Sequence, residues 1–181
     1  MVARDSSSLN HSLLCASIGA ALCFQVPADR SVFGSDLRIY VPRARMFTYP
    51  DCSVACGKLE LYSDKKDVLL NPLLIAEVLS PSTEAYDRGK KFEMYRTIES
   101  FREYSLTHQD RRHVEHYSKL NDGSWLLREH SGTESAIAIP RLNLQISMQD
   151  LYSSALNLPL QETNRAIPAR ATMPSWLLKR H

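Results

Sequence analysis

The sequence contains little glycine, six residues in 181, and none of it forms the glycine-rich loop that cradles nucleotide phosphates. Ser80 and Ser82 lack the flanking glycines of a serine-hydrolase elbow. The net charge is only +2, so bulk electrostatics do not indicate a nucleic-acid partner, and any such argument must rest on local clusters. These absences argue against P-loop nucleotide hydrolases and serine hydrolases.

The apolar stretches and the cysteines both favour a cytoplasmic protein. The apolar stretch 13–26 is shorter than the roughly 20 residues of a membrane-spanning helix, and no basic segment and cleavage site frame it. The four cysteines lie among apolar neighbours without the spacing of a disulfide scaffold: Cys15, Cys23, Cys52 and Cys56. We expect buried thiols in a reducing compartment.

The spacing of cysteines and histidines predicts no zinc site. Cys52 and Cys56 lie on a predicted strand, where four residues span about 13 Å, too far for two thiolates to share a zinc ion at about 2.3 Å each. Likewise, His113 and His116 are three residues apart on a predicted strand and point to opposite faces. His11 has no spaced partner, and we interpret it as a polar cap or as a contact near a functional site.

The alternation of apolar and polar segments predicts one mixed α/β domain. The predicted elements are a helix capped by Asn10 and ending near residue 24, strands at 37–41, 49–56 and 73–79, a helix at 84–97 and a strand at 103–107. This order is typical of a three-strand meander with helices on its faces and a crossover to a fourth strand.

The remainder of the chain is rich in predicted strands. They fall at 113–117, 125–129 and 136–139, with a hairpin turn at 121–123 and a short helix at 148–155. We predict a disordered N-terminus at 1–9, a domain at 10–156 and an irregular tail at 157–181.

Glu77 is the least expected charge in the sequence, because it interrupts an apolar strand. A buried acid is costly unless it is paired or ligates a metal, so Glu77 either forms a salt bridge with a neighbouring helix or binds a cation. Asp51, which follows Pro50 at the start of an adjacent predicted strand, supplies a second carboxylate. Neighbouring strands lie about 5 Å apart, so both acids can share one hard cation such as Mg²⁺.

The helix after Glu77 offers a lysine for the same site. Metal-assisted phosphodiester cleavage needs a base or cation near the attacking water. Asp87, Lys91 and Tyr95 recur at i, i+4 and i+8 and share one stripe, whereas Lys90 lies on another. If that stripe faces the sheet edge, Lys91 reaches the acids and Lys90 faces solvent.

Basic residues gather along this helix, and they predict either a solvated helix face or a surface for the phosphate backbone. The candidates for such contacts are Arg88, Lys90 and Arg96.

At these residues the sequence resembles the Uma-type family, restriction-endonuclease-like proteins of the PD-(D/E)XK superfamily. The matching segments are 32–38, Tyr49-Pro50-Asp51, the run Glu-Val-Leu-Ser-Pro-Ser-Thr at 77–83, then 87–92 and Tyr95, with weaker matches at 10–12, 109–110 and 113–115. The resemblance covers roughly residues 10–155. Its most specific part is the run at 77–83 with the downstream aspartate and lysine.

The resemblance implies a restriction-endonuclease-like core, which the C-terminal strands extend as an antiparallel β unit. It also implies a nuclease that uses Mg²⁺ or Mn²⁺. Asp51, Glu77 and the main-chain carbonyl of Val78 would bind the metal, and Lys91 would be the catalytic lysine. The candidate accessory residues are Asp36, Lys90, Asp87, Tyr95 and His11. Asp36 matches a recurrent family acid that either joins the site or anchors the first strand.

The sequence departs from the family pattern in three places. Leu79 stands where the superfamily carries its lysine, two residues after the second acid. The chain begins almost at the first helix, where family members usually carry a further segment, so we expect a packing element or an acidic ligand to be missing. The predicted fourth strand is unusually polar, with Ser105, Thr107 and His108.

Two functions follow from this pattern. One is a divalent-metal-dependent endonuclease that hydrolyses DNA phosphodiester bonds; a homodimer would suit it, because cutting both strands generally takes two sites. The other is a catalytically inactive nuclease-like module that binds DNA or protein, which the departures favour.

Overall fold

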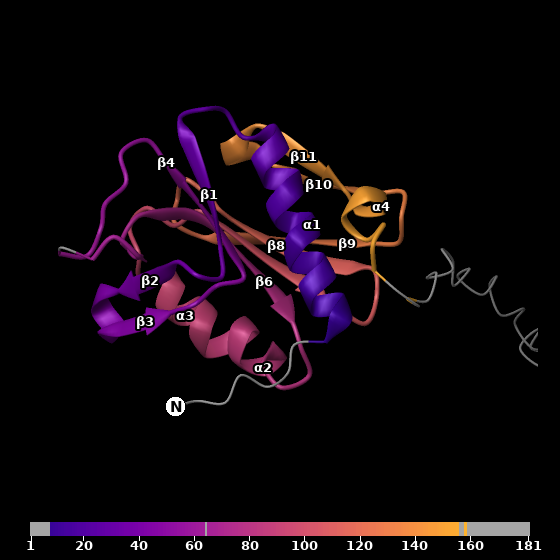
Figure 1. Cartoon of the computed structure of the whole chain (residues 1–181), viewed down its shortest axis with the longest axis horizontal. Coiled ribbons are helices and arrows are strands. Elements are labelled where there is room, and N and C mark those ends of the chain that lie inside the picture. Colours follow the sequence, from indigo (N-terminus) through magenta and orange to yellow (C-terminus); the bar gives the residue numbers. More distant parts are fainter. Residues whose placement is uncertain (1–7, 64, 156–157, 159–181) are drawn as a thin grey trace, which may run out of the picture.

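A six-stranded mixed sheet forms the centre of the molecule (Figure 1) in the computed structural model, which describes residues 8–63, 65–155 and 158. Its strands are ordered β1 (Arg30–Gly34), β4 (Cys52–Cys56), β6 (Pro72–Leu79), β7 (Glu103–His108), β8 (His113–Lys119) and β9 (Trp125–Ser131). The β6–β7 pair is parallel and the other neighbours are antiparallel. The mixed α/β fold class is therefore confirmed.

One face of the sheet is covered by the long helix α1 (Leu9–Gln25). Leu14, Ile18 and Leu22 form its buried stripe, and they share a core cluster with the side chains of β6 that point to this face, Leu74, Ala76 and Val78. The hairpin of β10 (Ala136–Ile139) and β11 (Leu144–Ser147) and the short helix α4 (Met148–Leu151) complete the same cluster. Of the predicted C-terminal antiparallel strands, β8 and β9 pair with each other in the central sheet, and β10 pairs with β11, a strand that the sequence did not predict.

The other face of β6 packs against a helical segment in three parts. These parts are α2 (Glu84–Tyr86), a π-helical turn η2 (Asp87–Lys91) and α3 (Phe92–Tyr95). Ile75 and Leu79 of β6 share a second core cluster with Phe92 and Tyr95. A small sheet adjoins this cluster, ordered β3 (Met46–Thr48), β2 (Arg38–Val41) and β5 (Val68–Leu69). Short 3₁₀ turns connect β2 to β3 (Pro42–Ala44) and β10 to β11 (Pro140–Leu142).

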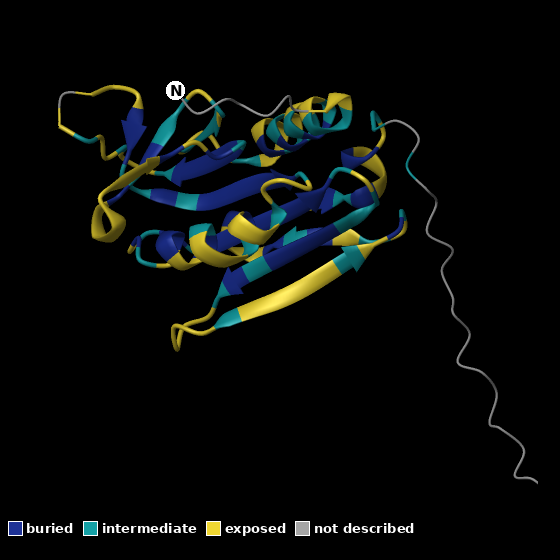
Figure 2. Ribbon diagram, turned by 90° about the horizontal axis from the view of Figure 1, so that it is seen from below, coloured by how far each residue is buried: buried dark blue, intermediate teal, exposed yellow. Residues whose placement is uncertain are grey.

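The inner strand β7 and the edge strand β9 differ sharply in burial. The predicted polar fourth strand, β7, lies between β6 and β8 and is buried along its whole length. By contrast, β9 forms the edge of the sheet and is mostly exposed (Figure 2). The polar residues of β7 are thus covered on both sides.

Three sequence predictions were wrong in detail. The strand predicted at 37–41 lies in the small sheet, and β1, which has no fully buried residue to mark it, takes its place in the meander. Ser8 rather than Asn10 caps α1, because its hydroxyl accepts from the backbone N–H of His11. Cys23 is exposed on the solvent side of α1, whereas Cys52 is buried; all four cysteines are free thiols.

Most of the predicted N-terminal segment 1–9 and C-terminal tail 157–181 lies outside the described residues. The predicted helix at 148–155 ends at Leu151. None of the described helices combines the length and the hydrophobicity that crossing a membrane requires.

Candidate active site

Asp51 lies directly before β4, at the end of the sheet where β6 finishes. Cys52 pairs with Ala76 in the antiparallel β4–β6 ladder, so Asp51 falls opposite Glu77 at the next register position. The backbone N–H of Val78 donates to Oδ2 of Asp51 at 2.7 Å. The Asp51 carboxylate therefore accepts a hydrogen bond from the backbone of β6 at the residue next to Glu77.

Glu77 is almost fully enclosed, with 2% of its surface exposed. Its Oε1 lies 2.8 Å from Nζ of Lys91 and accepts from the hydroxyl of Tyr95 at 3.2 Å. Burial raises the pKa of Glu77 to about 8, and the negative charges of Asp51 and Asp87 act in the same direction. The predicted salt bridge with the following helix is thus present, in a strongly negative environment.

Lys91 bridges two acids. Its Nζ also lies 3.1 Å from Oδ1 of Asp87, which is buried in the turn η2. Burial alone would lower the pKa of Lys91, but the attraction of Glu77 and Asp87 outweighs it and raises the pKa above its ordinary value. Lys91 is therefore held as an ammonium ion, while Lys90 faces solvent as the helical stripe predicts.

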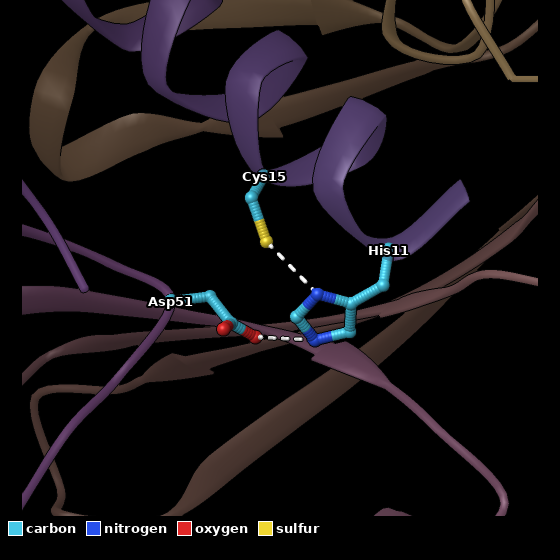
Figure 3. Close-up of side chains that lie close together, drawn as sticks. All are labelled: His11, Cys15 and Asp51. Carbon is cyan, nitrogen blue, oxygen red and sulfur yellow. Dashed lines mark hydrogen bonds and ion pairs between the residues drawn. The ribbon is translucent and has the colours of Figure 1, made fainter. Parts of the chain in front are cut away.

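His11 and Cys15 reach the site from α1. Nε2 of His11 lies 3.4 Å from Oδ2 of Asp51, and its Nδ1 lies 3.5 Å from Sγ of Cys15 (Figure 3). The contact with Asp51 raises the pKa of His11. Burial opposes ionisation of Asp51, yet the hydrogen bonds from His11 and Val78 lower its pKa. His11 is thus a site contact, and Cys15, which the sequence analysis passed over, lies one helical turn away.

The residues around Asp51 and Glu77 suit a hard divalent cation. Asp51, Glu77 and Asp87 supply three carboxylates against the single ammonium of Lys91. The contacts of Val78 and His11 with Asp51 are at Oδ2, and those of Lys91 and Tyr95 with Glu77 are at Oε1. Oxygen donors are what Mg²⁺ prefers. The donor set therefore fits the metal that the family resemblance implies.

The accessory acid Asp36 lies in the exposed turn after β1. Gly34 pairs with Cys52, so this turn is at the same end of the sheet as Asp51. Among the described residues no hydrogen bond or ion pair fixes the carboxylate of Asp36.

The basic candidates divide into two groups. Lys90 and Arg96 are exposed, and the guanidinium of Arg96 lies 5.1 Å from the centre of the Phe92 ring. Arg88 instead pairs with Glu84 and Glu115, and it also contacts His108. A phosphate group would have to compete with these acids for Arg88.

Comparisons with known proteins agree with this architecture. Residues 2–149 match the model of the Uma2 family, described as "Putative restriction endonuclease". Two uncharacterized proteins of Synechocystis sp. (strain ATCC 27184 / PCC 6803 / Kazusa) are similar. The protein sll1609 is 36% identical over 133 residues, 72% of this chain and 75% of its own. The protein slr1290 is 30% identical over 151 residues, 83% of this chain and 78% of its own.

A solved structure shares the fold. It is the crystal structure of "a putative nuclease belonging to DUF820 from Anabaena variabilis ATCC 29413", with a TM-score of 0.62 and 18% sequence identity over 81% of this chain and 82% of that one. This likeness confirms the predicted restriction-endonuclease-like fold.

Proposed function

Because the chain belongs to the Uma2 family of restriction-endonuclease-like proteins, we propose that it is a divalent-metal-dependent endonuclease that hydrolyses DNA phosphodiester bonds. The observation that carries the proposal is the register of β4 and β6. It sets Asp51 opposite Glu77, and the ammonium of Lys91 lies 2.8 Å from the second acid. Two carboxylates and a lysine are the groups that metal-assisted phosphodiester cleavage requires.

Each side chain of the site has its own role in the proposed reaction. Asp51 and Glu77, with the main-chain carbonyl of Val78, would hold Mg²⁺ or Mn²⁺, which neutralises phosphate charge and lowers the pKa of a bound water. Lys91 stays protonated, so it orients the attacking water and balances charge on the phosphate rather than accepting a proton. Asp87 and Tyr95 position this pair through their contacts with Lys91 and Glu77.

The DNA backbone would lie along the exposed side of the helical segment. Lys90 and Arg96 are free of carboxylate partners among the described residues and would contact phosphates, whereas Arg88 chiefly orders the acids around it. We further propose a cytoplasmic location, because the four cysteines are free thiols. A homodimer would supply two sites for cutting both strands.

Plasmid cleavage with Mg²⁺ or Mn²⁺ tests this function. We expect the wild-type protein to nick or linearise DNA, and Glu77→Ala and Glu77→Gln to lose this activity. Glu93→Gln, which changes an exposed acid on helix α3, should keep it. Equal cleavage by the wild type and both Glu77 variants would end the assignment. Salt-dependent DNA binding without cleavage, indifferent to chelator and to Asp51→Ala, would instead support the binding-module alternative.

A further inference from the structure

Helix α1 presents a thiol and an imidazole to Asp51. His11 and Cys15 are four residues apart and therefore lie on one face of the helix. The imidazole lies between the other two groups, with Nδ1 toward the Cys15 sulfur and Nε2 toward the Asp51 carboxylate (Figure 3). One donor atom from each of the three residues lies within 4.8 Å of the others.

The nature of these donors differs from that of the Asp51–Glu77 pair. Thiolate and imidazole select borderline and soft ions such as Zn²⁺ and Co²⁺, whereas Mg²⁺ takes oxygen ligands. Bond lengths of about 2.0–2.3 Å around tetrahedral zinc place ligand atoms roughly 3.3–3.8 Å apart. The separations of 3.4 Å from Nε2 to Oδ2 and 3.5 Å from Nδ1 to Sγ have this length, but they involve the two nitrogens of one ring. The imidazole therefore has to turn until a single nitrogen faces an ion that Oδ2 and Sγ share, and one donor atom of each residue already lies within 4.8 Å of the others.

The surrounding charge also favours a cation. The carboxylates of Asp51, Glu77 and Asp87 all act electrostatically on His11. The ammonium of Lys91 opposes them but is paired with Glu77 and Asp87. A divalent ion beside His11 would thus meet net negative potential.

We propose that His11, Cys15 and Asp51 form a second cation site, selective for a thiophilic divalent ion such as Zn²⁺, with a fourth position left for water. Binding releases the Cys15 thiol proton to the solvent, since a coordinating thiol is deprotonated. One consequence rests on the proposed nuclease function. Zn²⁺ at this site and Mg²⁺ at the nuclease site would both need Asp51 as a ligand. Zn²⁺ therefore competes with Mg²⁺ and inhibits cleavage.

A thiol protease-like triad is the competing explanation of the same cluster. Burial raises the pKa of the Cys15 thiol far above its ordinary value, and a nucleophilic cysteine needs the opposite shift. A metal ligand is a thiolate too, but a bound divalent ion itself supplies the positive charge that stabilises it, whereas a triad without an ion would have to hold the thiolate against this burial.

Co²⁺ absorption tests the site without reference to nuclease activity. Co²⁺ added to the reduced wild-type protein is expected to give the near-ultraviolet sulfur-to-cobalt charge-transfer band, and added Zn²⁺ is expected to abolish it. Cys15→Ser should lack the band, while Cys23→Ser, an exposed cysteine of the same helix, should retain it. His11→Ala should weaken Zn²⁺ binding by more than the roughly 10–100-fold that loss of a second-shell partner costs. Absence of the band in the wild type, or its persistence in Cys15→Ser, overturns the proposal.

A second measurement applies if Cys15→Ser does not fold. Zn²⁺ is then expected to protect Cys15, but not Cys23, from alkylation in the wild-type protein, as read by mass spectrometry; equal labelling with and without Zn²⁺ refutes the site. The inhibition is tested separately by adding Zn²⁺ to Mg²⁺-dependent cleavage, with relief expected in Cys15→Ser. A cobalt band without any cleavage would refute the nuclease function and support the cation site. Cleavage without a cobalt band would support the nuclease function and refute the cation site.

Discussion

Nζ of Lys91 lies 2.8 Å from Oε1 of Glu77 although the two residues come from different elements, a central strand and the π-helical turn that follows it. The side chain of Lys91 is 12% exposed and that of Glu77 is 3% exposed. Such a buried pair contributes little net stability, because desolvation offsets the attraction, but removal of one partner leaves a buried charge unpaired. The pair therefore fixes the position of the helical segment relative to Glu77 on β6.

Substitution by methionine should affect stability much more at Lys91 than at its neighbour Lys90. Lys91→Met removes the ammonium that Glu77 and Asp87 share. Glu77 can take up a proton because its pKa is already about 8, but Asp87 keeps an unpaired buried charge, so we expect the free energy of unfolding to fall by up to about 3–5 kcal/mol. Lys90→Met, at an exposed position, should stay within about 0.5 kcal/mol. Urea denaturation measures both. Similar losses of unfolding free energy in Lys91→Met and Lys90→Met would contradict the prediction that only Lys91 is a buried ion-pair partner.

The unusual ionisation of Glu77 should appear in the pH dependence of stability. Its pKa rises from 4.5 to about 8 on folding, so between these values the unfolded chain holds fewer protons than the native one, and stability falls as pH rises. Glu77→Gln should lack this decline. The informative quantity is the wild-type minus Glu77→Gln difference in unfolding free energy from pH 5 to 8, in which groups that do not interact with Glu77 cancel. His11, whose pKa Glu77 helps to raise, adds a decline of the same sign. A flat difference would speak against a raised pKa.

Arg88 should behave as a structural residue. Arg88→Ala leaves Glu115 and His108, both buried, without their shared donor, and loss of such a partner costs about 1–3 kcal/mol. Arg96→Ala, in the same helical segment but exposed, should cost far less. Thermal unfolding compares the two variants, and equal melting temperatures would rule out the proposed role of Arg88.

Contacts with the DNA backbone should show in the salt dependence of binding. Each phosphate contact contributes a slope of about −0.9 to log K against log salt, so Lys90→Gln and Arg96→Gln should each reduce the slope by about that amount. Arg128→Gln serves as the control, because Arg128 is exposed on the edge strand β9, three strands away from β6 in the sheet. Fluorescence anisotropy at several salt concentrations measures the slopes; equal changes at all three positions would indicate non-specific attraction.

The sequence predicted the parts of the fold that have strong patterns. An apolar run interrupted by one acid marked β6 and Glu77, and the four-residue spacing of Asp87, Lys91 and Tyr95 predicted which lysine would meet Glu77. The meander was predicted in order, except that the short, half-buried β1 gave no periodic signal and β2 was placed in the wrong sheet.

Contacts between distant elements were harder to foresee. The apolar neighbours of Cys15 predict a buried core thiol and give no hint that His11 and Asp51 lie nearby. Likewise, the pairing of Arg88 with Glu115 joins residues from the helical segment and from β8, and sequence spacing carries no information about such a contact. The four-residue interval between His11 and Cys15 was the one local signal available.

The π-helical turn at Asp87–Lys91 sets the phase of the side chains around it. Residues that repeat every four positions drift around a regular α-helix, because 3.6 residues complete a turn. A turn closed by i→i+5 hydrogen bonds is wider and shifts the drift in the opposite direction, so Asp87 and Tyr95 both remain in line with Lys91. Removal of a single residue such as Gly89 would return this segment to the regular winding and rotate one end of the acid–lysine–tyrosine row away from the strand.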